Sequence, residues 1–254
     1  MLEVVPLQAF KDNYIWTLRN ATHAAVVDPG EAGPVLEYLA RERLSLCAIL
    51  ATHHHADHVG GIPEILAQHP VAVYGPKGEP IATLSRAVGD GDAVDIPQLG
   101  ARFEVIAIPG HTRAHVAYYG AESLFCGDTL FACGCGRVFE GTPEQMHASL
   151  GRLAALPDPT RVYCGHEYTL ANIAFARKVE PDNAALAARE RAARALRDAG
   201  RPTLPSTLGE ERETNPFLRV SQPAVVESAN KYLGTRAASP AAVFAAIRDW
   251  KNRG

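Results

Sequence analysis

The sequence predicts a mixed α/β domain followed by a small all-helical domain. Short apolar runs separated by turns fill residues 1–168, and several of these runs are apolar throughout, which is typical of sheets buried under helices. After residue 168 the pattern changes to helical spacing. The length of 254 residues suits one large domain with an appendage. We therefore expect a first domain over 1–168 and a second over 169–254.

The elements of the first domain follow from apolar periodicity and turn residues. Three closely spaced strands are expected first, ending at the turn "DPGE", and Pro34 suits the first position of the next helix. The apolar run "LCAILAT" predicts a buried strand that ends at Thr52. Strands are expected at 3–10, 14–18, 24–28, 46–52, 71–75, 93–96, 102–108, 115–120, 123–128 and 161–166, and helices at 33–44, 59–69 and 143–156.

The second domain is expected to be helical. Helices are predicted at 170–179 and 183–200, the latter closed by Gly200, and a connector rich in proline and threonine follows over 201–216. Two further helices are expected at 223–233 and 240–251. Ser239 and Pro240 suit the N-cap and first position of the last one.

Composition and charge exclude several classes of protein. The net charge of −3 disfavours a nucleic-acid or membrane-surface partner, and no apolar run is long enough to span a bilayer. The N-terminus lacks the features of a signal peptide, and the five cysteines are odd in number. We therefore expect a cytoplasmic protein with reduced thiols. We also expect a monomer, although none of these observations bears on the oligomeric state. Cys133 and Cys135 could be metal ligands, but this is disfavoured because they stand alone in a glycine-rich stretch.

Four of the ten histidines crowd into the stretch "HHHADHVGG", directly after a predicted buried strand. Alternate residues of an extended chain point the same way, so His53 and His55 can face one point and His54 another. Asp57 and His58 follow a turn and can face a second point. Imidazole with carboxylate suits zinc, iron or manganese. Gly60 and Gly61 are expected to allow a tight bend into the next helix.

Three more candidate ligands follow glycines at the ends of predicted strands. They are His111 in "PGHT", Asp128 in "CGDT" and His166 in "CGHE". Strand ends on one rim would bring five histidines and two aspartates together, which is too many ligands for one zinc. The set suits two metals, and Asp128, a lone carboxylate on its own strand end, suits a bridge between them.

These motifs, in this order, resemble the metallo-β-lactamase superfamily. The stretches "DNYIW", "GCGRVFEGT", "GHEYT" and "NPFLR" resemble, more narrowly, the glyoxalase II family of hydroxyacylglutathione hydrolases. The resemblance covers nearly the whole chain. It implies an α+β fold, in which an αββα sandwich carrying the metals is followed by a small all-helical C-terminal domain that binds glutathione.

The resemblance also implies roles for individual residues. One metal would be held by His53, His55 and His111, the other by Asp57, His58 and His166, and Asp128 would bridge them. Asp57 could in addition orient the attacking hydroxide, which gives it and Asp128 catalytic roles. Asp28, in "AVVDPG", would support the ligand loop through hydrogen bonds. The two divalent ions are expected to be zinc, with iron or manganese as alternatives.

The implied reaction is hydrolysis of an S-(2-hydroxyacyl)glutathione, such as S-D-lactoylglutathione, to glutathione and D-lactate. This is the second step of methylglyoxal detoxification. The substrate is anionic, and the family's recognition residues correspond to Arg137, Phe139, Tyr168, Arg248 and Lys251. Arg248 and Lys251 share a helix face. Many family members have Lys-Phe-Tyr where this chain has Arg-Val-Phe at 137–139, so Phe139 lacks a hydroxyl and we expect an altered KM.

Other metal-dependent functions are the alternatives to this hydrolysis. A β-lactamase or lactonase would use a similar centre, a nuclease would require a more basic surface, and a persulfide dioxygenase would need one iron and not His166. A flavodiiron-type module would carry a carboxylate in place of His55 and a flavin domain that this chain lacks.

Overall fold

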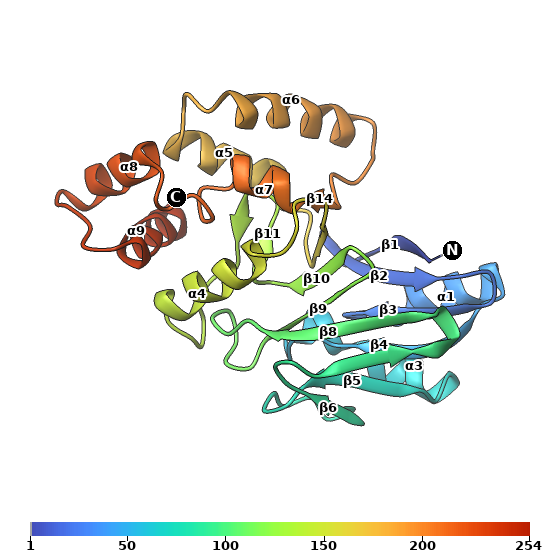
Figure 1. Ribbon diagram of the computed structural model, residues 1–254. Coiled ribbons are helices and arrows are strands. Elements are labelled where there is room, and N and C mark those ends of the chain that lie inside the picture. Colours follow the sequence, from blue (N-terminus) through green and yellow to red (C-terminus); the bar gives the residue numbers. More distant parts are fainter. Residues whose placement is uncertain (1) are drawn as a thin grey trace. The chain divides into compact units, whose positions relative to one another are not determined.

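The computed structural model describes residues 2–254, which group into two compact units (Figure 1). The first unit runs to Ala107 and also includes Thr112–Gly127, and the second holds Ile108–His111 and Asp128–Gly254. The segment Ile108–His111 thus belongs to a different unit from its neighbours in the chain. The expected boundary after residue 168 stays a prediction. Within residues 2–254, every helix is too short or too polar to cross a lipid bilayer.

The first unit is built on a mixed sheet with the strand order β1-β2-β3-β4-β5-β6. The β1, β2 and β3 strands are antiparallel, whereas β3 to β6 run parallel. The β3 strand is apolar and almost wholly buried, as expected for a strand covered on both faces. The bounds are β1 (Glu3–Ala9), β2 (Asn13–Arg19), β3 (His23–Val27), β4 (Ser45–Leu50), β5 (Ala72–Pro76) and β6 (Arg86–Val88).

Helices α1 (Gly33–Glu42) and α3 (Ile62–Gln68) pack on this sheet. Val35 of α1, Ile65 of α3 and Ile49 of β4 are fully buried members of one apolar core. Burying a side chain of this size contributes about 1.5–3 kcal/mol relative to leaving it exposed. The apolar residues that predicted these helices from their spacing are thus the residues that each helix buries against the sheet.

The helix predicted over 59–69 is divided into α2 (Ala56–Val59) and α3 at Gly60 and Gly61. Both glycines have ordinary negative φ values, of −61° and −80°, so the bend does not need the left-handed region. Close packing requires them instead. A Cβ on Gly61 would lie 2.4 Å from the Glu31 carbonyl carbon. The chain does bend at these two glycines, as expected, but glycine is needed there because a side chain would not fit.

The remaining strands of the first unit form an antiparallel run in the order β10-β9-β8-β7. Side chains of β8 alternate between buried and exposed along its first residues. The Tyr118 hydroxyl of β9 donates to the Ala51 carbonyl, 2.8 Å away, just beyond β4. The bounds are β7 (Ala93–Ile96), the 3-10 helix η1 (Pro97–Leu99), β8 (Ala101–Ala107), β9 (Val116–Gly120) and β10 (Ser123–Gly127).

The second unit is mainly helical. In it α9 packs against both α4 and α8, and α5 contacts α6, α8 and β12. The Ser239 hydroxyl accepts from the Ala242 amide at 3.2 Å, so the predicted N-cap of the last helix is correct. The bounds are β11 (Leu130–Phe131), β12 (Gly134–Cys135), α4 (Pro143–Ala154), β13 (Arg161–Cys164), α5 (Thr169–Val179), α6 (Ala184–Asp198), β14 (Ser206–Thr207), α7 (Leu208–Thr214), α8 (Pro223–Leu233) and α9 (Pro240–Arg253).

The connector expected over 201–216 contains regular structure. The β14 strand pairs with β13, and α7 follows directly. Helix α7 begins with a capping box, in which the Thr207 hydroxyl accepts from the Glu210 amide and the Glu210 carboxylate accepts from the Thr207 amide. The expectation of a plain connector was wrong, because the proline-rich composition hid this local capping motif.

Candidate active site

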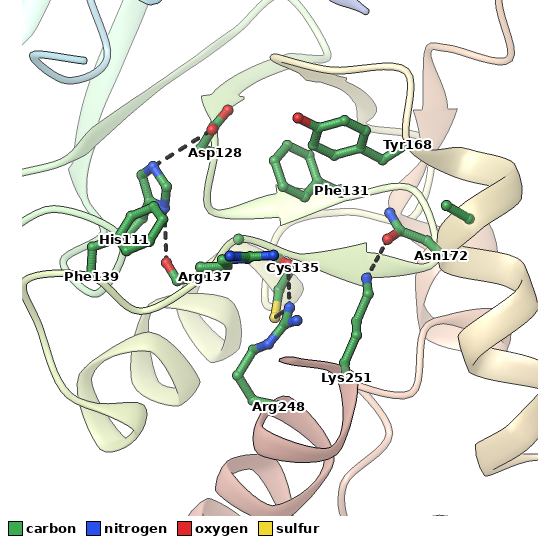
Figure 2. Close-up of a pocket in the computed structure, with 12 residues that line it drawn as sticks. His111, Asp128, Phe131, Cys135, Arg137, Phe139, Tyr168, Asn172, Arg248 and Lys251 are labelled. Carbon is green, nitrogen blue, oxygen red and sulfur yellow. Dashed lines mark hydrogen bonds and ion pairs between the residues drawn. The ribbon is translucent and has the colours of Figure 1, made fainter. Parts of the chain in front are cut away.

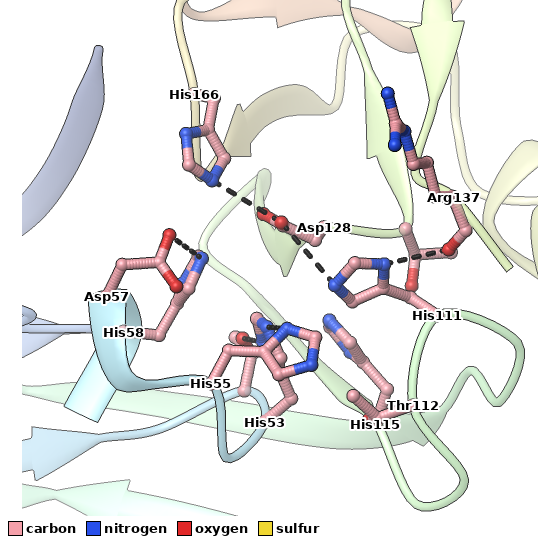
Figure 3. A network of polar contacts seen from close by, with 12 residues as sticks. His53, His55, Asp57, His58, His111, Thr112, His115, Asp128, Arg137 and His166 are labelled. Atoms are coloured by element: carbon pink, nitrogen blue, oxygen red, sulfur yellow. Dashed lines mark hydrogen bonds and ion pairs between the residues drawn. The ribbon is translucent and has the colours of Figure 1, made fainter. Parts of the chain in front are cut away.

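The His53–His58 stretch lies just beyond the carboxyl end of β4 and leads into α2. His53 is fully buried, and its Nε2 lies 3.1 Å from Nδ1 of His55 (Figure 3). The His54 ring bonds to Glu79 and lies edge-on to the His55 ring, with centroids 5.0 Å apart. The three consecutive histidines thus present two rings to one point and one ring elsewhere.

Asp57 and His58 lie together on α2. Nε2 of His58 is 3.6 Å from Oδ2 of Asp57. Asn13, in the "DNYIW" stretch, donates from Nδ2 to the same Asp57 oxygen at 3.0 Å. Asn13 therefore fixes one face of the carboxylate. Sequence reasoning singled out its motif but assigned Asn13 no role.

Asp28 is a buried carboxylate that holds two parts of this loop. It accepts from the amide and the hydroxyl of Thr52, both at 2.7 Å, and lies 3.1 Å from Nδ1 of His58. Its φ of +52° lies in the left-handed region, which is costly for a residue with a side chain. The hydrogen bonds compensate for this strain and leave Nε2 of His58 directed toward Asp57.

His115, to which the sequence gave no role, supports His53. The two rings stack with their centroids 4.5 Å apart and their planes 16° apart. Gly127 makes room for this stack. A Cβ there would lie 2.8 Å from the His115 ring and 2.3 Å from the Thr52 hydroxyl. The glycine before Asp128 is therefore required by the packing of the histidine cluster.

In the second unit, Asp128 lies between two histidines (Figure 3). Its Oδ2 is 3.5 Å from Nε2 of His111 and 3.3 Å from Nε2 of His166. Nδ1 of His111 lies 2.8 Å from the Arg137 carbonyl oxygen, which orients the ring. All three candidate ligands are buried. The three strand-end residues predicted from the sequence thus converge within this unit.

These residues adjoin a pocket of about 380 Å³ in the second unit (Figure 2). Figure 2 shows His111 and Asp128 on one side of the pocket and Arg248 and Lys251 on another. All five residues predicted to bind substrate line it. The lining side chains are those of His111, Asp128, Phe131, Cys135, Arg137, Phe139, Tyr168, Ala171, Asn172, Arg248 and Lys251.

Arg248 and Lys251 are cations on α9, of which Arg248 is buried and Lys251 is partly buried. Nη1 of Arg248 donates to the Cys135 carbonyl at 2.8 Å, while its buried Nε has no hydrogen-bond partner within residues 2–254. Nζ of Lys251 bonds to Oδ1 of Asn172. Burial lowers the pKa of Lys251 to about 8, and the neighbouring Arg248 cation contributes to this shift.

Neither of these cations forms an ion pair with a carboxylate of residues 2–254. Buried charges in proteins are normally paired, because removing a charge from water is costly. A buried and a partly buried cation that line one pocket therefore favour an anionic ligand. Carboxylate or phosphate groups would satisfy them through charge-assisted hydrogen bonds.

Aromatic side chains flank the histidines in the pocket. The Tyr168 ring stacks on His166 with centroids 4.6 Å apart and planes 5° apart. Phe139 is 61% exposed and its ring lies 5.2 Å from that of His111. Sequence reasoning missed Asn172, although it lies one helical turn after Tyr168 and so on the same face.

The two cysteines considered as ligands have other surroundings. Cys135 lines the pocket beside Arg248, and Sγ of Cys133 lies 3.6 Å from the Thr214 hydroxyl. Burial raises the pKa of Cys133 to about 12. No cysteine belongs to a group of potential metal ligands within residues 2–254.

The donor set fits divalent metals. In the first unit Asp28, His53 and His58 form one compact group of potential ligand atoms. His58 and His111 each direct Nδ1 to a protein oxygen, and Nε2 of each lies near the carboxylate of Asp57 or Asp128. Such outer hydrogen bonds are typical of metal-binding histidines. Clusters of histidine and aspartate of this kind hold zinc, iron or manganese.

Two family models match consecutive parts of the chain. The model of the metallo-β-lactamase superfamily matches residues 11–166, and the model of the hydroxyacylglutathione hydrolase C-terminus matches residues 167–254. The α+β metallo-β-lactamase fold expected from the sequence is thereby confirmed.

Curated relatives and solved structures agree with these matches. The chain is 55% identical to the hydroxyacylglutathione hydrolase of Alkalilimnicola ehrlichii over 100% of both chains. It is 52% identical to that of Nitrosomonas eutropha over 99% of each. The crystal structure of TTHA1623 in a di-iron-bound form is similar with a TM-score of 0.59 and 26% identity, covering 85% of this chain and 100% of that one. The chain therefore belongs to the hydroxyacylglutathione hydrolase (glyoxalase II) family of the metallo-β-lactamase superfamily.

Proposed function

We propose that this protein hydrolyses S-(2-hydroxyacyl)glutathione thioesters, S-D-lactoylglutathione first among them, to glutathione and a 2-hydroxy acid such as D-lactate. It would thus carry out the second step of methylglyoxal detoxification. One observation, in addition to family membership, supports an anionic thioester as the substrate. The cations Arg248 and Lys251 share a pocket with the candidate metal ligands His111 and Asp128. An anionic thioester can reach both groups at once.

The proposal includes two divalent metal ions, with zinc preferred over iron and manganese. Its ligands are His53, His55 and His111 for one ion, Asp57, His58 and His166 for the other, and Asp128 for both. Bound metals of this kind supply a hydroxide nucleophile near neutral pH and polarise the carbonyl group. The similarity to a structure with a di-iron centre supports the number of ions.

The protein's own residues would bind and orient the substrate. Arg248 and Lys251 would hold a carboxylate of glutathione, and Arg137 would add a third cation at the pocket wall. Tyr168 and Phe139 would flank the thioester, because each ring contacts a candidate ligand histidine. Fixing the peptide in this way places the carbonyl for attack and reduces the entropic cost of reaction.

Asp28 and Asn13 would keep the metal ligands in place. Asp28 orients His58 through Nδ1, and Asn13 orients Asp57 through Oδ2. Asp57 could then both bind a metal and help to direct the attacking hydroxide. Such outer partners typically affect metal affinity or activity by about 10–100-fold.

A comparison of substrates tests the proposal. Hydrolysis of S-D-lactoylglutathione, a β-lactam and a thioester without glutathione should be measured on one sample whose metal content is known. We expect kcat/KM to be far higher for the glutathione thioester, with about two metal ions per chain. Preference for the β-lactam, or full activity with one tightly bound ion, would contradict it.

The cation pair gives a sharper test of substrate class. We expect the double substitution Arg248→Ala with Lys251→Ala to raise KM by about 10–100-fold, because a hydrogen bond to a charged group contributes about 1.5–3 kcal/mol. The kcat should stay closer to the wild-type value, as expected for ground-state binding. Arg253→Ala, on the exposed face of the same helix, is the matched control and should leave KM unchanged. A loss confined to kcat would argue against a binding role.

The proposal also describes a cytoplasmic monomer with no nucleic-acid or membrane partner. Light scattering of the purified protein tests whether it is a monomer, and fractionation of cells tests whether it is cytoplasmic.

A further inference from the structure

Glu79 is a buried carboxylate outside the proposed ligand set. It follows β5, and its side chain is only 2% exposed. A carboxylate so placed is costly unless hydrogen bonds replace the water that it has lost. Both of its oxygens are in fact used, and each by a different segment of the first unit.

One oxygen holds the histidine stretch. Oε2 of Glu79 accepts from the backbone amide of His54 at 3.2 Å and also bonds to Nδ1 of the His54 ring. His54 stands between the proposed ligands His53 and His55. This double contact fixes both the backbone and the ring of the residue that separates them.

The other oxygen holds the segment that follows His111 in the chain. Oε1 accepts from the Thr112 hydroxyl at 2.8 Å and from the Ala114 amide at 2.9 Å. Thr112 is fully buried. A single carboxylate therefore ties together two segments, each adjacent in sequence to proposed ligands of the same metal.

We propose that Glu79 is a positioning residue for the metal held by His53, His55 and His111, and that it acts through His54 and Thr112. The inference rests on the proposed function only in taking this metal centre as given. It assigns a role to His54, the one histidine of the stretch that the ligand set leaves out. Metal-binding loops are commonly oriented by such outer hydrogen bonds.

The charge of Glu79 is consistent with this role. Burial by itself raises the pKa of the carboxyl group, but hydrogen bonds from His54, Thr112 and Ala114 outweigh it, and the net pKa is lower than usual. Glu79 is therefore an acceptor for all of these donors at neutral pH. The isosteric substitution Glu79→Gln would place an amide N–H against at least one donor.

Metal affinity, measured without substrate, is the readout. The protein should be freed of metal and titrated with Co²⁺ in competition with a chelator, while the visible absorption of the bound ion is followed. We expect Glu79→Gln to weaken one of the two binding steps by about 10–100-fold. Glu180→Gln is the matched control, because Glu180 is also a buried carboxylate but pairs with Arg219 at 2.8 Å in the second unit. It should leave both steps unchanged.

His54 provides a second route, should Glu79→Gln fail to fold. We expect His54→Ala to weaken the same step, and His54→Asn to restore most of the affinity, because an asparagine amide can replace the Nδ1–H donor. Wild-type affinity in Glu79→Gln or His54→Ala would overturn the role of Glu79. So would equal losses in His54→Asn and His54→Ala.

Failure of this inference can be told from failure of the proposed function. If the wild type does not hydrolyse glutathione thioesters but Glu79→Gln still weakens metal binding, the function is wrong and the positioning role stands. If the wild type hydrolyses them and the Glu79 and His54 variants bind metal normally, only the positioning role is wrong.

Discussion

Lys251 is the residue whose protonation state most affects the proposed binding of glutathione. Its ammonium group is packed near the rings of Phe175 and Phe217, and Arg248 adds a like charge. Burial therefore lowers the pKa of Lys251 from its usual 10.5 to about 8. The cation is mostly present at neutral pH and is lost as the pH rises through this value.

This shift predicts weaker ligand binding at alkaline pH. The Kd of S-methylglutathione, a thioether that cannot be hydrolysed, should be about tenfold higher at pH 9 than at pH 7, because each pH unit above the pKa lowers the charged fraction about tenfold. Calorimetry at the two pH values measures the change. In Lys251→Arg the charge persists, so the Kd should change less than about twofold. Equal pH dependence in both proteins would exclude Lys251 as the cause.

Some features of the individual site residues could be predicted from the sequence and others could not. Local spacing predicted that His53 and His55 turn away from His54, because the alternation of an extended chain is a local property. The contacts of Glu79 and His115 with this stretch were not predictable. Each arrives from a distant part of the chain, and nothing in its own neighbourhood marks it. Asn172 could have been found, since its spacing from Tyr168 is one helical turn.

Among the elements, the β11–β12 hairpin depends on a buried polar network. Asn215 donates from Nδ2 to the carbonyl oxygens of Phe131 at 3.1 Å and Gly134 at 2.9 Å. Glu211 accepts from the Cys133 amide at 2.9 Å. The hairpin supplies Phe131 of β11 and Cys135 of β12 to the pocket wall. The network therefore holds a wall of the pocket without lining it.

Asn215→Ala should accordingly affect both stability and substrate binding. Loss of its donors leaves buried carbonyls unsatisfied, which costs about 1–3 kcal/mol. We expect a lower free energy of unfolding in urea and a higher KM for the glutathione thioester. Asn230→Ala, on α8 outside the pocket, is the control for a lost asparagine hydrogen bond. A destabilised variant with wild-type KM would show that the hairpin does not position the pocket.

Elements with a strong apolar period or a clear capping residue were predictable from the sequence, whereas strands of only two residues were not. The start of α9 was predicted correctly at Ser239 and Pro240, because the capping chemistry is local. Strands β11, β12 and β14 span two residues each, too few for a period to appear. The "NPFLR" stretch marked the family, but its physical role appeared only when Asn215 was seen to bond the hairpin.

On the scale of the whole molecule, metal binding and folding should be linked. A ligand that binds only the folded protein stabilises it, by about 2.7 kcal/mol when its concentration is 100 times Kd. We expect a chelator to lower the Tm of the wild type. Asp128→Ala should have a lower Tm that the chelator no longer changes, and its turnover should be abolished, because a ligand of both proposed metals is lost. Asp95→Ala, an exposed carboxylate in the first unit, should behave like the wild type. A chelator effect in Asp128→Ala equal to that in the wild type would contradict a shared ligand.

The division of the chain into two units predicts which segments must be exchanged together in a chimera of two such enzymes. A chimera joined between residues 166 and 167, where the two family models meet, would exchange Arg248 and Lys251 but leave His111 and Arg137 behind. All four line one pocket and belong to one unit, which consists of Ile108–His111 and Asp128–Gly254. Substrate preference should therefore be inherited intact only when that short upstream segment and everything from Asp128 onward come from the same parent.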